Sequence, residues 1–325
     1  MHTMRPAKTQ RGVALVTAVL IVAIVASIAA FAAFSQQVWL RRLQNTADRS
    51  ATDVLVRGAL HWASVALIDD ASSGNTVDSL NEKWAMPLPT LPVEGGAIRV
   101  SMEDAQGRFN LNNVWRNSAP STPDIAILQR LLTELRLDPS LTEPLLDWID
   151  PDSNARPLGA EDTEYLNGKL PYRAANQPLA SVDELRLIRG YDAKTVDALR
   201  PYVIALPVPT DINVNTAPAP VLAALVPGLD IATATQIASG RVANPMRDVG
   251  AFRARLPGGI AAPQSGIAVK SDYFLVKLET SIGRQERWTE ALLQRDAGGK
   301  STTLLWERPQ PLVNPNEEQQ PDKQP

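Results

Sequence analysis

KTQRGVALVTAVLIVAIVASIAAFAAF, residues 8–34 of the chain, joins a short basic head to an uncharged apolar segment. As a helix, the segment 13–34 would rise about 33 Å, which is enough to cross the hydrocarbon core of a bilayer. Arg5, Lys8 and Arg11 precede it and no acidic residue offsets them. The positive-inside rule therefore predicts a cytoplasmic N-terminus, a single membrane crossing and an exported remainder.

A secretory signal peptide and a plain anchor are the two alternatives for this segment. A signal peptide has an apolar core of about 7–15 residues followed by its cleavage site. Ala30-Phe31-Ala32 offers such a site, but the apolar run is too long. A plain anchor would lead through a linker to an independent domain, whereas apolar residues here continue at three- and four-residue steps: Leu40, Leu43, Ala47, Ala51, Leu55, Ala59, Trp62 and Ala66. We therefore expect one helix over 13–68, apolar all round in its first half and amphipathic in its second.

The composition of the whole chain argues against several chemistries. With 325 residues, of which 44% are hydrophobic, the chain is long enough for two domains or for one domain with a large insertion. Its net charge of −3 gives no general attraction to nucleic acid. It has no cysteine and only two histidines, His2 and His61, so thiolate metal sites, a cysteine nucleophile and a serine–histidine–acid triad are disfavoured. We do not expect an enzyme.

Hydrophobic periodicity beyond the long helix predicts strands on both sides of a helical block. Strands are expected at 97–102, 107–112, 273–280, 287–293 and 302–306, and helices at 124–137, 141–149, 192–199, 216–226, 231–239 and 249–256, with a capping box from Ser181 to Glu184. The economical fold is α+β: a long N-terminal helix and a small antiparallel sheet (69–119 and 263–308), interrupted by an all-α insertion at 120–262. Two sequential domains are the alternative, but they would leave the first two strands as a marginal isolated pair. Residues 309–325 are expected to form a disordered tail.

An acidic loop follows the second predicted helix of the insertion. Asp150, Asp152 and Asn154 alternate, and Glu161 stands eleven positions after Asp150. These spacings match the first, third, fifth and twelfth positions of an EF-hand loop. Ala155 replaces the glycine that an EF-hand needs at its sixth position. We therefore expect an oxygen-rich loop of similar reach and not a true EF-hand.

Two interpretations of this loop stay open on the residues alone. Three carboxylates and an amide, with Asp162 as a further candidate and Asp147 one helical turn away, suit a hard cation such as calcium. The lack of nearby histidine or cysteine disfavours zinc and copper. The alternative is a turn whose acidic side chains are solvated. A glycosidase pair at Glu161 and Asp162 would need a cleft with aromatic walls, and Trp148 is the sole tryptophan near the loop.

A second motif, NTAPAPVLAALVPGLD at 215–230, places two predicted helices around Pro227-Gly228 and resembles a helix-hairpin-helix. Such hairpins grip DNA phosphate with backbone N–H groups. The usual second glycine is Asp230 here, and its carboxylate would repel phosphate. Arg241 and Arg247 are too few for a phosphate track. We expect a packing module and no nucleic-acid partner. A membrane-tethered module for DNA binding or uptake is the alternative function.

The head Lys8-Thr-Gln-Arg-Gly12, followed by apolar residues from Val13, resembles a type IV prepilin leader. The resemblance implies that a prepilin peptidase cuts after Gly12 and N-methylates Val13, so that residues 1–12 are the leader and the apolar helix is kept. Pilins usually carry glutamate at the fifth mature position, which is Thr17 here. Threonine cannot neutralise the amine of a neighbouring subunit, but its hydroxyl can bond a carbonyl one turn back. We interpret this as the mark of a subunit that starts a filament.

Five further motifs narrow the resemblance to one family. They are QGRFNLNN (106–113), DWIDPDSN (147–154), GAED (159–162), YRAANQP (172–178) and INVNTA (212–217). With the leader and Thr17, they resemble the type II secretion minor pseudopilin K family over nearly the whole chain. This implies a type IV pilin-like core with a large inserted α-domain that binds calcium, in a protein of the bacterial inner membrane with its bulk in the periplasm.

The same resemblance implies a function and a set of partners. The expected function is to cap the tip of the pseudopilus and to initiate its assembly for the export of folded proteins across the outer membrane. The expected partners are the minor pseudopilins I and J, together with H and the major pseudopilin G. A contact between the tip and the secretin or an exported substrate is a further expectation.

Overall fold

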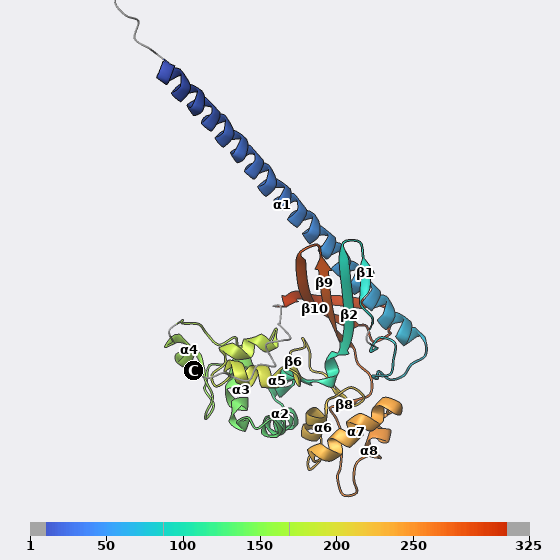
Figure 1. Cartoon of the computed structure of the whole chain (residues 1–325). Coiled ribbons are helices and arrows are strands. Elements are labelled where there is room, and N and C mark those ends of the chain that lie inside the picture. The colour runs from blue at the N-terminus through green and yellow to red at the C-terminus, as the bar shows by residue number, and fades with distance from the viewer. Residues whose placement is uncertain (1–10, 87, 169, 311–325) are drawn as a thin grey trace, which may run out of the picture.

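The computed structural model describes residues 11–86, 88–168 and 170–310, and its helix α1, Arg11–Ser72, projects from the rest as a stem (Figure 1). Among the described residues, α1 is the one helix long and apolar enough to cross a membrane, and its apolar window is not buried by the rest of the chain. No proline interrupts it, and the Thr17 hydroxyl donates to the carbonyl oxygen of Val13 at 2.9 Å. The observed helix contains the predicted range 13–68 and is longer at both ends. Residues 1–10 of the predicted leader lie outside the described residues.

Five antiparallel strands form one sheet that packs on the C-terminal half of α1. In sheet order they are β1 Leu91–Val93, β2 Gly96–Asp104, β9 Tyr273–Ile282, β10 Gln285–Arg295 and β11 Thr302–Gln310. Side chains alternate along a strand, so β9 turns Phe274, Val276 and Leu278 toward α1, where they are buried. The pairing of β2 with β9 joins strands from the two sides of the helical block. The predicted α+β fold with one interrupted sheet is therefore confirmed.

The sheet covers a stripe of α1 that overlaps only in part with the one that the apolar spacing predicts. The buried residues of this half are Thr52, Val56, Ala59, Leu60, Ala63 and Leu67. Of the predicted stripe, Ala59 is buried and Leu55 and Ala66 pack against the same core, but Leu43 and Trp62 remain 54% and 40% exposed. Apolar residues occur on more than one face of this helix. The spacing of the apolar residues therefore does not determine which face is buried. The position of the sheet determines it.

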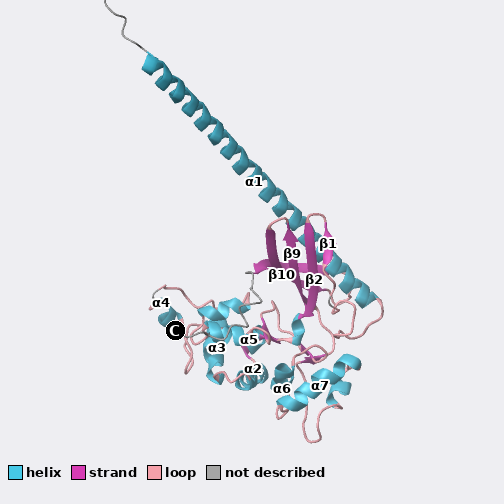
Figure 2. Ribbon diagram, viewed as in Figure 1, coloured by secondary structure: helices cyan, strands magenta, loops and turns pink. Residues whose placement is uncertain are grey.

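The insertion leaves the sheet after β2 and returns before β9, and Figure 2 shows its short helices gathered beyond the sheet. Its α-helices are α2 Thr122–Glu134, α3 Thr142–Ile149, α4 Asp162–Leu166, α5 Ala193–Leu199, α6 Ala219–Leu225, α7 Ile231–Ala243 and α8 Val249–Arg253. Single 3₁₀ turns occur at Ala105–Gly107, Leu111–Val114, Pro139–Leu141 and Val182–Leu187. Three pairs of two-residue strands complete it: β3 Phe109–Asn110 with β6 Val203–Ile204, β4 Trp115–Arg116 with β5 Ala119–Pro120, and β7 Ile212–Asn213 with β8 Ile267–Ala268. The predicted helical insertion is therefore confirmed, and the short strand pairs add to it because its connecting segments bond to one another.

Packing also places the limits of the insertion outside the predicted 120–262. The segment 107–112 was predicted to be an edge of the main sheet, but it contains β3, which pairs in parallel with β6. Phe109 and Leu111 are buried in the core of the insertion, and Ile267 packs there from the other end. We therefore place the insertion at residues 105–272, between β2 and β9.

The predicted tail, 309–325, overlaps the last strand. Strand β11 continues to Gln310, so Pro309 and Gln310 belong to the sheet. Since β11 is an edge strand, the missing N–H of Pro309 need not break a ladder hydrogen bond. Residues 311–325, and with them the prediction of disorder, lie outside the described residues.

Candidate metal site and polar joint

The acidic loop between α3 and α4 brings three carboxylates together. Helix α3 ends at Ile149 and α4 begins at Asp162, so the two helix ends fix the loop between them. One carboxylate oxygen each of Asp150, Asp152 and Glu161 lies within 4.8 Å of the other two. The structure thus groups three of the five residues that the sequence nominates as cation ligands.

Two of these carboxylates are buried, and three of their four oxygens lack hydrogen-bond partners among the described residues. Asp150 is 0% exposed and Glu161 is 4% exposed. Asp150 Oδ1 and both carboxylate oxygens of Glu161 accept no hydrogen bond, which is unfavourable for a buried polar group. Burial, and then the charges of Asp147 and Asp150, raise the pKa of Glu161 to about 7. A cation among the three carboxylates would relieve both conditions, and an all-oxygen donor set fits calcium.

Arg156 and Asp147 organise the loop around this cluster. Arg156 Nη1 donates to Asp147 Oδ1 at 2.7 Å and also pairs with Asp150. The backbone N–H of Arg156 donates to Asp147 Oδ2 at 3.1 Å. Because both oxygens of Asp147 are engaged, this residue positions Arg156 rather than offering a ligand atom. One guanidinium faces several carboxylates here, so the site keeps an excess of negative charge.

Of the other two nominated ligands, Asp162 is not part of this carboxylate cluster, and Asn154 bonds one of its members. The side-chain amide and the backbone N–H of Asn154 both donate to Asp152 Oδ1, at 3.0 and 2.8 Å. Asp162 accepts from the Ala174 N–H at 3.0 Å and from Arg173 Nη1 at 3.0 Å. Asp162 therefore ties the start of α4 to a later loop. A role of Asn154 and Asp162 as ligands stays a prediction.

Gly159 closes this site because no larger residue fits beside Asp147. A Cβ at position 159 would lie 1.9 Å from Asp147 Oδ2 and 3.1 Å from the backbone nitrogen of Arg156. We expect Gly159→Ala to displace Asp147, to lower the free energy of unfolding by about 1–3 kcal/mol and to weaken calcium binding. Denaturant unfolding and calcium titration of the full chain in detergent micelles measure the two effects.

The matched control is Gly240→Ala. A Cβ at position 240, on helix α7, meets nothing within 4 Å. Alanine favours a helix over glycine by up to about 1 kcal/mol, so this variant should be neutral or more stable. Equal losses in the two variants, or none in Gly159→Ala, would contradict the account of the loop.

The hairpin at 215–230 packs as a structural module. Asp230 is the N-cap of α7: its carboxylate accepts from the N–H of Thr233 at 2.9 Å and from its hydroxyl at 2.7 Å. The backbone N–H of Thr233, a donor that a DNA phosphate would need, is therefore already bonded, and the negative charge of Asp230 lies beside it. The hairpin packs into the core of the insertion through Leu222, Leu225 and Ile237, which are buried there. The alternative of a DNA-binding module is not supported.

The asparagines of the 106–113 and 212–217 motifs hold the loops of the insertion together. The Asn112 side chain donates to the carbonyl oxygen of Leu179 at 2.9 Å and accepts from its N–H at 2.8 Å. Asn110, Asn113 and Asn215 make similar two-way contacts with backbone groups. A side-chain amide that both donates and accepts satisfies buried loop backbone as a strand would.

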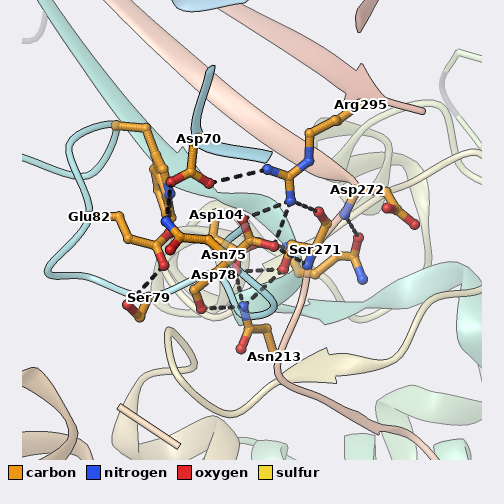
Figure 3. A network of polar contacts seen from close by, with 12 residues as sticks. Asp70, Asn75, Asp78, Ser79, Glu82, Asp104, Asn213, Ser271, Asp272 and Arg295 are labelled. Carbon is orange, nitrogen blue, oxygen red and sulfur yellow. Dashed lines mark hydrogen bonds and ion pairs between the residues drawn. The ribbon is translucent and has the colours of Figure 1, made fainter. Parts of the chain in front are cut away.

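A second buried polar group joins the insertion to the stem, and the sequence pattern did not point to it. Arg295, at the end of β10 and 1% exposed, donates through Nη2 to both carboxylate oxygens of Asp78, at 2.7 and 2.6 Å, and to the carbonyl oxygen of Ser271 at 2.7 Å (Figure 3). Asn213 Nδ2 donates to Asp104 Oδ2 at 2.8 Å and to Ser271 Oγ at 3.0 Å. We call this group the polar joint; its members are Asp70, Asp78, Glu82, Asp104, Asn213, Ser271 and Arg295.

Comparisons with known proteins agree with one another. Two family models, both described as type II secretion system protein K, match residues 107–208 and 212–270. The chain is 36% identical to type II secretion system protein K of Pseudomonas aeruginosa over 310 residues, covering 90% of each, and 32% identical to that of Klebsiella pneumoniae, covering 88% of this chain and 93% of the relative. A chain in the crystal structure of the GspK-GspI-GspJ complex from enterotoxigenic Escherichia coli superposes with a TM-score of 0.73 at 28% identity, covering 83% of this chain and 99% of that one.

Proposed function

Because the chain belongs to the type II secretion system protein K family of minor pseudopilins, we propose that it caps the tip of the pseudopilus and initiates its assembly for the export of folded proteins across the outer membrane. The observation that carries this proposal is the position of the insertion, which lies beyond the sheet at the end of the molecule away from the apolar start of α1 (Figure 1). A further subunit stacked in that direction would meet the insertion. The apolar part of α1 is exposed and remains open to lateral packing.

We further propose how this stem is matured and placed. Val13 and the apolar residues after it are exposed, which suits a segment surrounded by lipid and by other stems. The apolar part of α1 would lie in the inner membrane, with the sheet and the insertion in the periplasm. Cleavage by the prepilin peptidase after Gly12 and methylation of Val13 would leave this helix as the N-terminus.

The proposed partners follow from the relative of known structure. That relative was solved as a GspK-GspI-GspJ complex, and we propose the minor pseudopilins I and J as partners of this chain. Leu43 and Trp62, which the sheet leaves exposed on α1, are available for such contacts outside the bilayer. Contacts with pseudopilin H and the major pseudopilin G, and a tip contact with the secretin or an exported substrate, remain predictions.

Calcium would have a structural role in this function. Asp150, Asp152 and Glu161 would hold the ion, and its charge would neutralise carboxylates that otherwise face one another without donors. Bound there, it would stiffen the loop between α3 and α4. No chemical step is expected from the site.

Removing the insertion tests the capping role. Asp104 and Phe274 are paired across β2 and β9, so residues 105–272 can be replaced by two residues that form a three-residue hairpin loop with Tyr273. We expect the intact chain at one end of each isolated pseudopilus, and the shortened chain along its length as well. Immunogold labelling and the ratio of this subunit to the major pseudopilin measure the difference. Circular dichroism of the shortened chain confirms that its helix and sheet still form. A shortened chain confined to the tip would contradict the proposal.

Thr17→Glu tests whether the fifth mature position marks the first subunit. The Thr17 hydroxyl donates to the carbonyl oxygens of Val13 and Ala14, at 2.9 and 3.0 Å, so it needs no partner from another chain. A carboxylate within the bilayer is unfavourable by up to about 3 kcal/mol unless a neighbouring charge meets it. We therefore expect a several-fold loss of secretion and of co-purified pseudopilins I and J, with Thr17→Ser close to wild type. Normal secretion and assembly in Thr17→Glu would show that this position carries no information.

A further inference from the structure

The chain passes between the sheet and the insertion twice, after β2 and before β9, and both passages end in the polar joint. The first leaves β2 at Asp104, whose Oδ2 accepts from Thr216 Oγ1 at 2.6 Å and from Ser271 Oγ at 2.7 Å. The second returns at Ser271, whose N–H donates to Asp78 Oδ2 at 2.8 Å. Stem and insertion are therefore fastened through one buried network of side chains (Figure 3).

On the stem side, the segment after α1 carries the acidic half of the joint. Asp70, Asp78 and Glu82 each place one carboxylate oxygen within 4.8 Å of the other two. Glu82 also accepts from Trp84 Nε1 at 2.7 Å. Trp84 packs edge-on against Phe274 of β9, with ring centroids 5.1 Å apart. Glu82 thus connects the carboxylates to the hydrophobic core between stem and sheet.

The charges within the joint do not balance. Arg295 pairs with Asp78 at 2.6 Å and lies 3.5 Å from Asp70. The guanidinium of Arg295 therefore already occupies the place that a bound cation would take. Among the described residues, no cation pairs with Glu82. The other charged groups that face the joint are Asp104 at the end of β2, Lys270 and Asp272 on the return from the insertion, Asp296 after β10, and Arg241 of α7. Three ionised carboxylates beside one guanidinium would repel one another unless one of them holds a proton.

We propose that the polar joint is a pH-sensitive latch, which a proton on Asp70 or Glu82 keeps closed. Loss of the proton leaves an uncompensated negative charge, and repulsion loosens the segment 73–86 from the sheet and from the passage at Ser271. A role of the latch in pseudopilus assembly would rest on the proposed function. The latch itself is a property of the isolated chain.

The direction of the pH dependence follows from the buried groups. Burial, opposed by the hydrogen bond from Trp84 and aided by the charges of Asp70 and Asp78, raises the pKa of Glu82 to about 7 from an ordinary 4.5. Burial also raises the pKa of Asp70. A pKa raised in the folded state means that the stabilisation is complete below about pH 4.5 and is lost as the pH rises to about 7. The latch is therefore closed in mild acid and loosened above neutrality.

Hydrogen exchange of the full chain in detergent micelles tests the proposal. Glu82→Gln keeps an oxygen for Trp84 but cannot ionise, so it imitates the protonated latch. At pD 4.5 we expect wild type and Glu82→Gln to exchange alike in residues 73–86 and 269–272, because the stabilisation by the proton is almost complete there. At pD 8 we expect the wild type to exchange at least about tenfold faster there than Glu82→Gln, because local opening follows the lost proton. Comparing the two proteins at one pD removes the intrinsic pH dependence of exchange.

Two further variants make the result decisive. Glu94→Gln, at an exposed position before β2, should follow the wild type at both pD values. Asp70→Asn removes a different charge from the same group and should also slow exchange at pD 8, which keeps the test available if Glu82→Gln folds poorly. Equal exchange of wild type and both latch variants at pD 8 would overturn the latch. Failure to recruit pseudopilins I and J would overturn the proposed function and leave the latch untouched.

Discussion

Arg295→Met is expected to lower the free energy of unfolding of the full chain by about 3–5 kcal/mol, the range for breaking a buried ion pair from one side. Asp78, 1% exposed, would lose both hydrogen bonds from Arg295 and would keep the one from the Ser271 N–H. Its charge would then be buried with no cation beside it. Denaturant unfolding in detergent micelles, followed by tryptophan fluorescence, measures the loss.

Two comparisons separate this effect from a simple loss of positive charge. Arg99 pairs with Glu279 on the same sheet at 3.3 Å, but its side chain is 56% exposed. Arg99→Met should therefore change the unfolding free energy by about 0–1 kcal/mol. Adding Asp78→Asn to Arg295→Met removes the stranded charge and should recover part of the loss. If Arg295→Met proved no worse than Arg99→Met, the polar joint would not be the fastening described here.

Withdrawing calcium is expected to lower the unfolding free energy by about 3 kcal/mol when the ion was first present at 100 times its dissociation constant. The reason is that Asp150 Oδ1 and both carboxylate oxygens of Glu161 have no donors among the described residues and would gain a cation as their partner. Melting the full chain in detergent with calcium and with chelator measures the difference.

The ligand assignment has its own controls. Glu161→Gln should abolish the effect of the chelator, because it removes a charge from the centre of the site. Asp162→Asn should retain it, because Asp162 bonds Ala174 and Arg173 outside the carboxylate cluster. A melting temperature that ignores chelator in the wild type would contradict calcium binding. An equal response of wild type and Glu161→Gln to the chelator would show that calcium binds at another site.

The acidic loop shows how much of a candidate site the local sequence can predict. The alternation of Asp150, Asp152 and Asn154 and the distance to Glu161 were readable as an oxygen-rich loop. The conformation of the loop could not be predicted in the same way. Arg156 folds back onto Asp147 and Asp150, and Gly159 allows Asp147 to approach the backbone closely. Which carboxylates end within reach of one ion depends on these contacts and not on spacing along the chain.

The motif asparagines give the opposite lesson. They carried the resemblance to the family without an evident chemical role. In the structure, Asn110, Asn112 and Asn113 bond backbone groups of 179–210, and Asn215 bonds the backbone of Met246. Their role is structural, and their partners lie up to 98 residues away along the chain. A local pattern could mark these residues but could not say what they bond.

The sequence alone determined the stem, four of the five strands of the main sheet (β2, β9, β10 and β11) and the interruption of that sheet. An apolar run without proline forms a helix by local hydrogen bonds, and period-two alternation marks a half-buried strand wherever it pairs. The tertiary structure decided which face of α1 is buried, where the insertion begins, and that Arg295 meets Asp78 from 217 positions away. These outcomes depend on sheet register and on the burial of charge. Both are set by contacts between distant segments and leave no periodic trace in either one.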